Sequence, residues 1–210
     1  MIMNFKTEQE QFWAGDFGNE YVDRNSNPNS IARRTAVFSE ILSRTKDVNS
    51  IIEFGTNIGH NLIALRNLLP MCALSGIEIN TKAIQTLKNI SDIKIFEGSI
   101  LGFTSKDLGQ FDLTFTSGVL IHINPDKLQE VYSKLYDCSN KYILVKEYYN
   151  PNPVEVNYRG NSERLFKRDF AGEIMDLYPD LELVDYGFQY HRDNNFPMDD
   201  STWFLLKKNR

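Results

Sequence analysis

The chain has 210 residues, of which 41% are hydrophobic and 24% are charged, and its formal net charge is −5. These values are typical of a soluble globular protein and exclude a wholly disordered or fibrous chain. The acidic balance and the absence of an extended basic cluster argue against a nucleic-acid partner. No apolar run reaches the roughly 18–20 residues of a membrane helix, and the first residues lack the apolar core of a signal peptide, so we predict a cytosolic protein without a membrane partner.

Cysteine and histidine usage gives no metal or redox signature. Cys72 and Cys138 fall in apolar stretches, which favours buried thiols over a disulfide. The three histidines, His60, His122 and His191, show none of the spacings that zinc sites use. We therefore predict no metal site.

Residues 1–50 are predicted to form a helical arm, or lid, rather than part of a sheet. Thr7 and Glu10 have the spacing of a capping box, which predicts a short helix. The Gly-, Asn- and Asp-rich residues 14–30 are predicted to be dominated by turns. Ser30 is predicted to cap a second helix, whose apolar residues recur at helical spacing.

From residue 51 onward, apolar strands alternate with helical patterns. The predicted strands cover residues 51–54, 73–77, 93–96, 111–115, 142–145, 181–186 and 202–206. Strands separated by helices imply parallel pairing, whereas only an irregular loop separates the last two. We therefore predict an α/β fold with a doubly wound, mostly parallel sheet of about seven strands and an antiparallel last strand.

This organisation is compatible with one domain of four parts. The arm precedes a cofactor-binding core at 51–147, a substrate-side insertion at 148–168, and a helix with a hairpin at 169–210. Asn80 and Asn124-Pro125 are predicted to begin two helices of the core.

In a doubly wound sheet, ligands bind at the carboxyl ends of the strands, so the loops there carry the functional prediction. The first loop contains Gly55 and Gly59, which allow tight turning and close approach, and Asn57, the best non-glycine candidate for a positive φ. The second strand ends in Glu78, whose carboxylate can accept hydrogen bonds from both hydroxyls of a ribose. Together they predict a cofactor that contains a nucleoside.

The residues around the first loop distinguish among such cofactors. A dinucleotide site favours G-x-G-x-x-G, but the sequence from Gly55 is G-T-N-I-G-H. With Glu53 in front of it, the pattern E-x-G-x-N-x-G resembles motif I of the class I S-adenosylmethionine-dependent methyltransferases. The resemblance implies a Rossmann-like fold and S-adenosyl-L-methionine as cofactor, with Glu53 toward its amino acid end and Glu78 on its ribose.

The same resemblance implies further cofactor contacts. Ser99 follows the third strand, where the family often has an acidic residue near the adenine amino group, and residues 111–123 resemble the family's fourth-strand motif and its loop. Aromatic side chains of the arm are predicted to close over the cofactor, with Phe17 among them and Phe12 assigned to the core. The predicted cofactor-binding residues are Trp13, Tyr21, Glu53, Gly55, Thr56, Asn57, Gly59, Glu78, Ile79, Gly98, Ser99, Ile100, Ser117, Gly118 and Val119.

A narrower resemblance covers nearly the whole chain. The segments TEQEQFWAGDFGNEYVDRN, EYYNPNPVEVNYRG, RLFKRDFAGEIMD and FPMDDSTWFLLKK are similar to the methylase family associated with pseudaminic acid biosynthesis. This resemblance implies a sugar or sugar-linked small molecule as the acceptor.

Methyl transfer to an alcohol or an ammonium requires removal of a proton. His122, in the loop after the fourth strand, is the first candidate for the catalytic base, and His191, in the loop between the last two strands, is the second. Arg24 or Arg33 is predicted to pair with the cofactor carboxylate. The predicted substrate contacts are Tyr149, Tyr158, Arg159 and Lys167, with Glu147 as a further polar contact.

Two other functions stay open from the residues alone. A nicotinamide-dependent oxidoreductase uses the same sheet, and a non-catalytic cofactor-binding protein of a biosynthetic complex would have the same cofactor site. The sequence leaves the choice between O- and N-methylation and the oligomeric state open.

Overall fold

The computed structural model describes residues 5–25, 27 and 29–209. The arm forms three helices, α1 (Glu8–Ala14), α2 (Asp16–Arg24) and α3 (Asn29–Leu42). The predicted capping box is confirmed, because the Glu10 N–H donates to Thr7 Oγ1 and the Glu10 carboxylate accepts a hydrogen bond from the Thr7 N–H. This box starts α1 and turns its carboxylate inward.

Two predictions for the arm are wrong. Residues 14–30 are not dominated by turns, because most of them form α2. Val22 is buried in a small apolar cluster, so tertiary packing outweighs the low helix propensity of the Gly, Asn and Asp residues around it. Ser30 does not cap α3, which begins one residue earlier; its hydroxyl instead hydrogen-bonds His60 Nδ1 at 2.6 Å.

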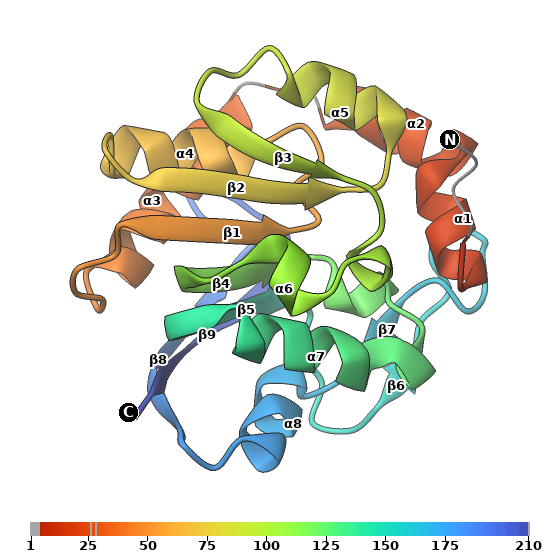
Figure 1. Cartoon of the computed structure of the whole chain (residues 1–210). Coiled ribbons are helices and arrows are strands. Elements are labelled where there is room, and N and C mark those ends of the chain that lie inside the picture. The colour runs from red at the N-terminus through yellow and green to blue at the C-terminus, as the bar shows by residue number, and fades with distance from the viewer. Residues whose placement is uncertain (1–4, 26, 28, 210) are drawn as a thin grey trace.

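A seven-stranded sheet lies at the centre of the structure (Figure 1). Its strands are β1 (Ser50–Phe54), β2 (Ala73–Glu78), β3 (Ile93–Glu97), β4 (Phe111–Ser117), β5 (Ser139–Glu147), β8 (Leu181–Gln189) and β9 (Ser201–Lys208). Their order is β3-β2-β1-β4-β5-β9-β8; the first five run parallel, and β9 is antiparallel to both β5 and β8. The predicted doubly wound, mostly parallel sheet with an antiparallel ending is confirmed.

Helices cover both faces of this sheet (Figure 1). One face carries α3, α4 (His60–Leu68) and α5 (Thr81–Leu87), and the other carries α6 (Ser105–Leu108), α7 (Leu128–Asp137) and α8 (Phe170–Leu177). Short 3-10 turns occur at Ile100–Gly102, Leu120–His122 and Pro125–Lys127. As predicted, Asn80 caps α5, and Asn124 with Pro125 begins the turn that leads into α7.

The two faces bury separate apolar clusters because apolar side chains point to both sides of the short strands. Ile52 and Ile143 belong to the cluster beneath α7 and α8, whereas Ile51 and Leu144, one position along, belong to the cluster beneath α3 and α4. The predicted thiols are buried and free, in accord with the sequence. The chain turns from β3 back to β4 beside β1, so the carboxyl ends of β1 and β4 form the switch point where such sheets bind ligands.

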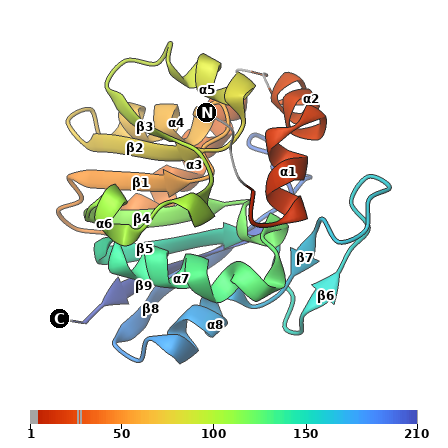
Figure 2. The ribbon, with the colours of Figure 1, turned by 45° about the vertical axis from the view of Figure 1, so that its right-hand side comes forward.

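The insertion after β5 forms a small two-stranded ribbon of β6 (Val154–Glu155) and β7 (Phe166–Lys167). Figure 2 shows this ribbon beside α1, at the same end of the sheet as the arm. The sequence predicted a substrate-side insertion there but assigned no strands to it. The arm and the ribbon thus flank the carboxyl ends of the parallel strands.

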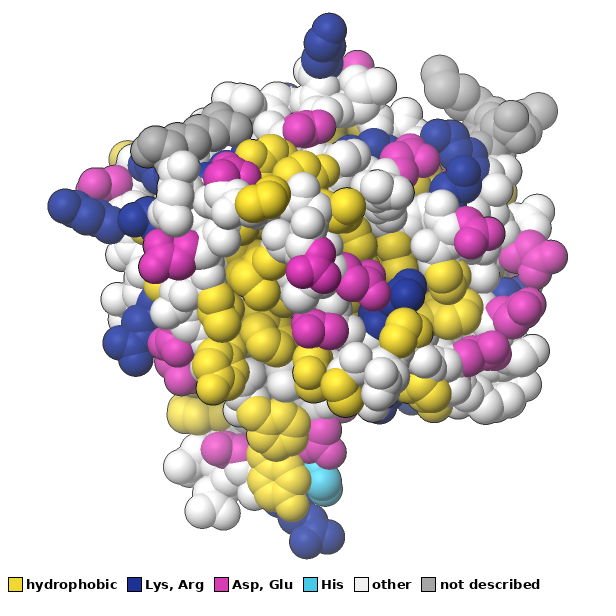
Figure 3. Space-filling view, turned by 90° about the horizontal axis from the view of Figure 1, so that it is seen from below, with side chains coloured by type: hydrophobic (Ala, Val, Ile, Leu, Met, Phe, Trp, Pro, Cys, Tyr) yellow, Lys and Arg dark blue, Asp and Glu magenta, His cyan; other side chains and the backbone are white. Residues whose placement is uncertain are grey.

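The edge strand β8 exposes a row of aromatic side chains. Tyr186 and Phe188 are 65% and 60% exposed. Figure 3 shows hydrophobic side chains gathered on the face of the molecule that is seen from below, with charged groups between them. Among the described residues, no helix has both the length and the apolar character that crossing a bilayer requires.

Candidate active site

A cavity opens at the carboxyl ends of β1 to β4, beneath the arm. It encloses about 1170 Å³ of empty space when the solvent at its open mouth is included. Every predicted cofactor-binding residue except Gly59 lines it: Trp13, Tyr21, Glu53, Gly55, Thr56, Asn57, Glu78, Ile79, Gly98, Ser99, Ile100, Ser117, Gly118 and Val119. The cavity therefore gathers residues that are far apart in the sequence into one site.

The loop after β1 has the backbone that its residues predicted. Gly55 and Asn57 have φ values of 82° and 49°, so the predicted positive φ of Asn57 is confirmed. A Cβ on Gly55 would lie 2.5 Å from Val119 Cγ2, which means that this loop packs closely against the turn after β4. Gly59, with a φ of 81°, begins α4, and a Cβ there would meet Leu87 at 2.7 Å. Gly59 thus packs α4 against α5 and does not face the cavity.

Glu78 joins the ends of β1 and β2. Its carboxylate accepts hydrogen bonds from the Asn57 N–H at 2.6 Å and the Asn80 N–H at 2.7 Å. Burial raises its pKa, and these backbone donors act in the opposite direction. Each carboxylate oxygen can accept more than one hydrogen bond, so the group can hold the loop and still receive donors from a ligand.

Glu53, at the end of β1, is fully buried, and only one of its two carboxylate oxygens is hydrogen-bonded within the described part of the chain. Its Oε1 accepts a hydrogen bond from the Asn61 side-chain amide at 2.5 Å, whereas Oε2 has no hydrogen-bond partner among the described residues. Burial raises the pKa of Glu53 to about 8, although the Asn61 amide and the Arg34 guanidinium lower it. A buried carboxylate oxygen of this kind calls for a donor or a cation.

Arg34 of α3 supplies a positive charge near Glu53 that the sequence did not identify. It lines the cavity, and its guanidinium donates a hydrogen bond to the Ser30 carbonyl at 3.2 Å. The residues predicted for this role lie elsewhere: Arg24 pairs with Glu20 at 3.3 Å, and Arg33 does not line the cavity. Side chains one position apart point in different directions on a helix, so this difference depends on the rotation of α3.

A second unpredicted side chain stands at the end of β3. Glu10 of α1 is 7% exposed, lines the cavity, and accepts a hydrogen bond from the hydroxyl of Ser99. Ser99 also accepts a hydrogen bond from the Leu101 N–H at 3.0 Å. An acidic group is therefore present beside Ser99, but it comes from the arm.

His122 lies at the end of the 3-10 turn that follows β4, and it faces the cavity. Its Nδ1 lies 2.6 Å from the Arg164 carbonyl oxygen, which accepts hydrogen bonds only. Nδ1 must therefore carry the proton, which leaves a lone pair on Nε2. Burial lowers the pKa of His122 to about 4, so the neutral ring predominates near pH 7.

Glu147 holds the turn that carries His122. Its carboxylate, fully buried at the end of β5, accepts hydrogen bonds from the N–H groups of Val119 at 3.0 Å, Leu120 at 3.1 Å and Ile121 at 3.4 Å. Burial raises its pKa, and the backbone donors lower it. The structure thus places Glu147 beneath the turn and not, as predicted, at a substrate surface.

Aromatic rings of the arm and of the ribbon meet at His122. The ring centroids of Trp13 and Tyr158 lie 4.5 Å and 5.0 Å from that of His122. Tyr21 lines the cavity and packs edge-on against Trp13 at 5.1 Å. Phe12 lies outside the described apolar clusters and stacks on Phe17 of α2 at 4.1 Å, so its prediction as a core residue is wrong.

Several predicted residues lie outside the cavity. His191 is exposed, and its Nδ1 pairs with Asp200 at 2.8 Å. Tyr149 is 41% exposed beside Phe204, Arg159 is exposed in the ribbon loop, and the Lys167 ammonium lies over the ring of Tyr148. The described residues contain no cluster of three or more potential metal ligands.

No family model and no curated protein matches this chain, but solved structures share its fold. The plantazolicin methyltransferase BpumL in complex with SAH has a TM-score of 0.69 at 15% identity, over 96% of this chain and 94% of that one. The glycopeptide N-methyltransferase MtfA complexed with SAM has a TM-score of 0.61 at 11% identity, over 84% of this chain and 94% of that one. The resemblance to the pseudaminic acid family therefore stays a prediction, whereas the fold is confirmed: this chain has the Rossmann-like fold of these methyltransferases.

Proposed function

We propose that this chain is an S-adenosylmethionine-dependent methyltransferase that acts on a small molecule. The observation that carries the proposal is the unpaired, fully buried Glu53 Oε2 in a cavity that also presents Arg34 and Glu78. The ammonium and the carboxylate of an amino acid complement Glu53 and Arg34, respectively. The hydroxyls of a ribose complement Glu78. S-Adenosylmethionine carries all of these groups, and BpumL and MtfA were crystallised with SAH or SAM.

Different residues of the cavity bind different parts of the proposed ligand. Glu53 receives the ammonium on Oε2, Arg34 pairs with the carboxylate, and Glu78 accepts hydrogen bonds from the ribose. Gly55, Thr56 and Asn57 lie against the ligand, and the close approach of Gly55 to Val119 holds their loop against the turn after β4. Trp13 and Tyr21 cover it from the arm, with aromatic faces that favour a nearby cation.

The bound sulfonium supplies an electrophilic methyl group. The work left to the protein is to position the acceptor in line with that group and to remove its proton. We assign the proton to His122, because its Nε2 has a free lone pair and its Nδ1–H is fixed by the Arg164 carbonyl. His191 lies outside the cavity and has no such position.

We further propose a sugar or a sugar-linked molecule, such as a nonulosonic acid or a surface glycan, as the acceptor, methylated on oxygen or nitrogen. The support is the resemblance of four segments to the pseudaminic acid methylase family and the aromatic ring of Tyr158 beside His122, since aromatic faces pack well against sugar rings. MtfA is named as a glycopeptide N-methyltransferase, so glycopeptides belong in the same acceptor screen. Mass spectrometry for a gain of one methyl group identifies the acceptor.

Replacing Glu78 by alanine is expected to weaken binding of S-adenosylhomocysteine by about 10- to 100-fold, the scale of lost charge-assisted hydrogen bonds. Isothermal titration calorimetry measures the change. Glu97→Ala is the matched control, because Glu97 pairs with Glu78 in the register of β2 and β3 but is exposed and lies outside the cavity. Unchanged affinity in Glu78→Ala would remove this residue from the site, and micromolar binding of NAD(P) in place of the adenosyl compound would favour an oxidoreductase.

The affinity for S-adenosylhomocysteine is expected to rise with pH between about pH 6 and pH 8, approaching tenfold per unit, and then to level off. The reason is the raised pKa of Glu53, about 8: below it the free carboxyl is protonated, and binding of an ammonium must expel that proton. Calorimetry in two buffers of different ionisation enthalpy measures the proton release. Glu53→Gln should lose the pH dependence, and a flat profile in the unmodified protein would contradict the assignment.

A further inference from the structure

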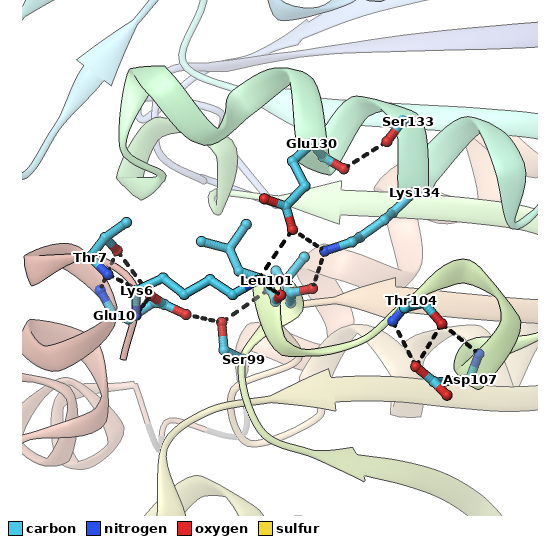
Figure 4. A network of polar contacts seen from close by, with 11 residues as sticks. Lys6, Thr7, Glu10, Ser99, Leu101, Thr104, Asp107, Glu130, Ser133 and Lys134 are labelled. Carbon is cyan, nitrogen blue, oxygen red and sulfur yellow. Dashed lines mark hydrogen bonds and ion pairs between the residues drawn. The ribbon is translucent and has the colours of Figure 1, made fainter. Parts of the chain in front are cut away.

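Glu10 lines the cavity, and its carboxylate lies beside Ser99 in the loop after β3 (Figure 4). Its Oε2 accepts hydrogen bonds from the N–H groups of Lys6 at 2.7 Å and Thr7 at 2.8 Å, which are capping contacts within α1. Its Oε1 points to the loop after β3, where the Ser99 hydroxyl donates to it. One oxygen thus belongs to the helix, and the other faces the site.

The arm is fastened to this loop beside Glu10. The Lys6 ammonium donates a hydrogen bond to the Leu101 carbonyl at 2.6 Å and lies 3.6 Å from the Glu130 carboxylate, as Figure 4 shows. Glu130 in turn pairs with Lys134 at 2.8 Å. These contacts hold α1 in place against the 99–101 loop, so the position of the Glu10 carboxylate is defined by the fold and not only by its own side-chain rotamer.

The position of the Glu10 carboxylate relative to Glu78 indicates which part of a bound nucleoside it would face. The Gly98 N–H donates to the Glu78 main-chain carbonyl at 2.7 Å, so Ser99 follows directly beside the end of β2. A nucleoside whose ribose lies on Glu78 and whose chain extends toward Glu53 on β1 must place its base on the other side, over the end of β3. Ile79, Ile100 and Leu101 line the cavity there, which suits a flat apolar ring.

We propose that Glu10 selects a purine that carries an exocyclic amino group over one that carries a carbonyl oxygen at the same position. A carboxylate only accepts hydrogen bonds, and the Ser99 hydroxyl is already directed to it. An amino group donates to that oxygen, whereas a carbonyl would bring two sets of lone pairs together. The inference rests on the proposed function and adds to it. The base is recognised by a residue of α1, which is far in sequence from the strands that bind the rest of the nucleoside.

Glu10→Gln tests this selection and retains the start of α1, since glutamine also occupies the third position of a capping box. In this variant the amide oxygen still accepts hydrogen bonds from the Lys6 and Thr7 N–H groups. The amide NH₂ group then faces the base, so a hydrogen-bond donor replaces the carboxylate oxygen that accepts hydrogen bonds in the unmodified protein. Calorimetry with S-adenosylhomocysteine and S-inosylhomocysteine should show the adenine preference fall by about 10- to 100-fold, with tighter binding of the inosine compound than in the unmodified protein.

Two further variants complete the experiment. Glu8→Gln removes the same charge from an exposed position of α1, where the carboxylate pairs with Arg164, and should leave the base preference unchanged. Glu10→Asp keeps the charge but withdraws it, so the adenine affinity should fall without a reversal of preference; this variant serves if Glu10→Gln does not fold.

The outcomes separate this inference from the function on which it rests. Adenosyl binding that depends on Glu78 but shows the same base preference in Glu10→Gln and in the unmodified protein would overturn the role of Glu10 and leave the proposed function standing. If the unmodified protein binds neither compound, both fail. A third outcome is that Glu8→Gln loses the adenine preference to the same extent as Glu10→Gln. That result would show that the preference depends on the net charge of α1 and not on a contact with Glu10, and it would overturn the assignment.

Discussion

Replacing Glu147 by alanine is expected to lower the free energy of unfolding by about 3 kcal/mol or more. The three N–H groups of residues 119–121 that donate to this carboxylate would lose their acceptor, and two of those residues are themselves fully buried. An unsatisfied buried donor costs about 1–3 kcal/mol, so the sum exceeds the loss of a typical surface contact severalfold. Urea denaturation measures it as a lower midpoint with an unchanged slope.

Two companion variants test the cause of that loss. Glu147→Gln keeps an oxygen for the Val119 and Leu120 N–H groups and should cost less than half as much as alanine. Glu182→Ala removes an exposed carboxylate from β8 and should stay within about 0.5 kcal/mol of the unmodified protein. Equal stability of Glu147→Ala and Glu182→Ala would show that the turn after β4 does not depend on this carboxylate.

His122→Ala is expected to slow methyl transfer by on the order of 10²-fold or more while S-adenosylhomocysteine binding is retained. The proposed base would be gone, but the carboxylates of the cofactor site would stay in place. Single-turnover kinetics with the acceptor from the screen measure the rate, and calorimetry measures the binding. Far-UV circular dichroism confirms that the variant folds, because the ring also packs against Trp13 and Tyr158.

The pH dependence of the rate adds an independent reading of His122. A base must be unprotonated, and burial lowers the pKa of this ring to about 4, so its protonation should reduce the rate only as the pH falls toward that value. His191→Ala is the matched control, since the ring lies on the surface and pairs with Asp200. Full activity in His122→Ala, or equal losses in the two variants, would end the role of His122 as the base.

Local patterns in the sequence were sufficient for much of the fold. The capping box at Thr7, the cap at Asn80 and the start at Asn124-Pro125 involve residues within four positions of one another, so their interactions form largely irrespective of tertiary context. The positive φ of Asn57 is likewise a local preference. Short apolar strands separated by helices sufficed for the doubly wound sheet, because few topologies bury both faces of such strands.

The roles that the sequence did not reveal depend on contacts between residues far apart in the chain. Glu10 meets Ser99 across 89 positions, and Glu147 reaches the N–H of Val119 across 28. Arg34 faces the cavity only because of how α3 is rotated on the sheet. For α2, the low helix propensity of Gly, Asn and Asp predicted turns, and only the packing of side chains such as Val22 reverses that preference. No local signal carries this information.

The cavity is bounded by two parts of the chain that are held in different ways. Its floor is the edge of a sheet that is anchored in large apolar clusters, whereas α1 on the opposite side is joined to that edge through polar contacts such as the Lys6 ammonium on the Leu101 carbonyl and the Asn80 amide on the Trp13 carbonyl. Contacts of this kind are individually weak, and segments held by them open at a lower free energy than the whole molecule. We therefore expect α1 to detach at a lower free energy than the sheet unfolds, which would let a ligand enter and leave the cavity while the sheet stays intact.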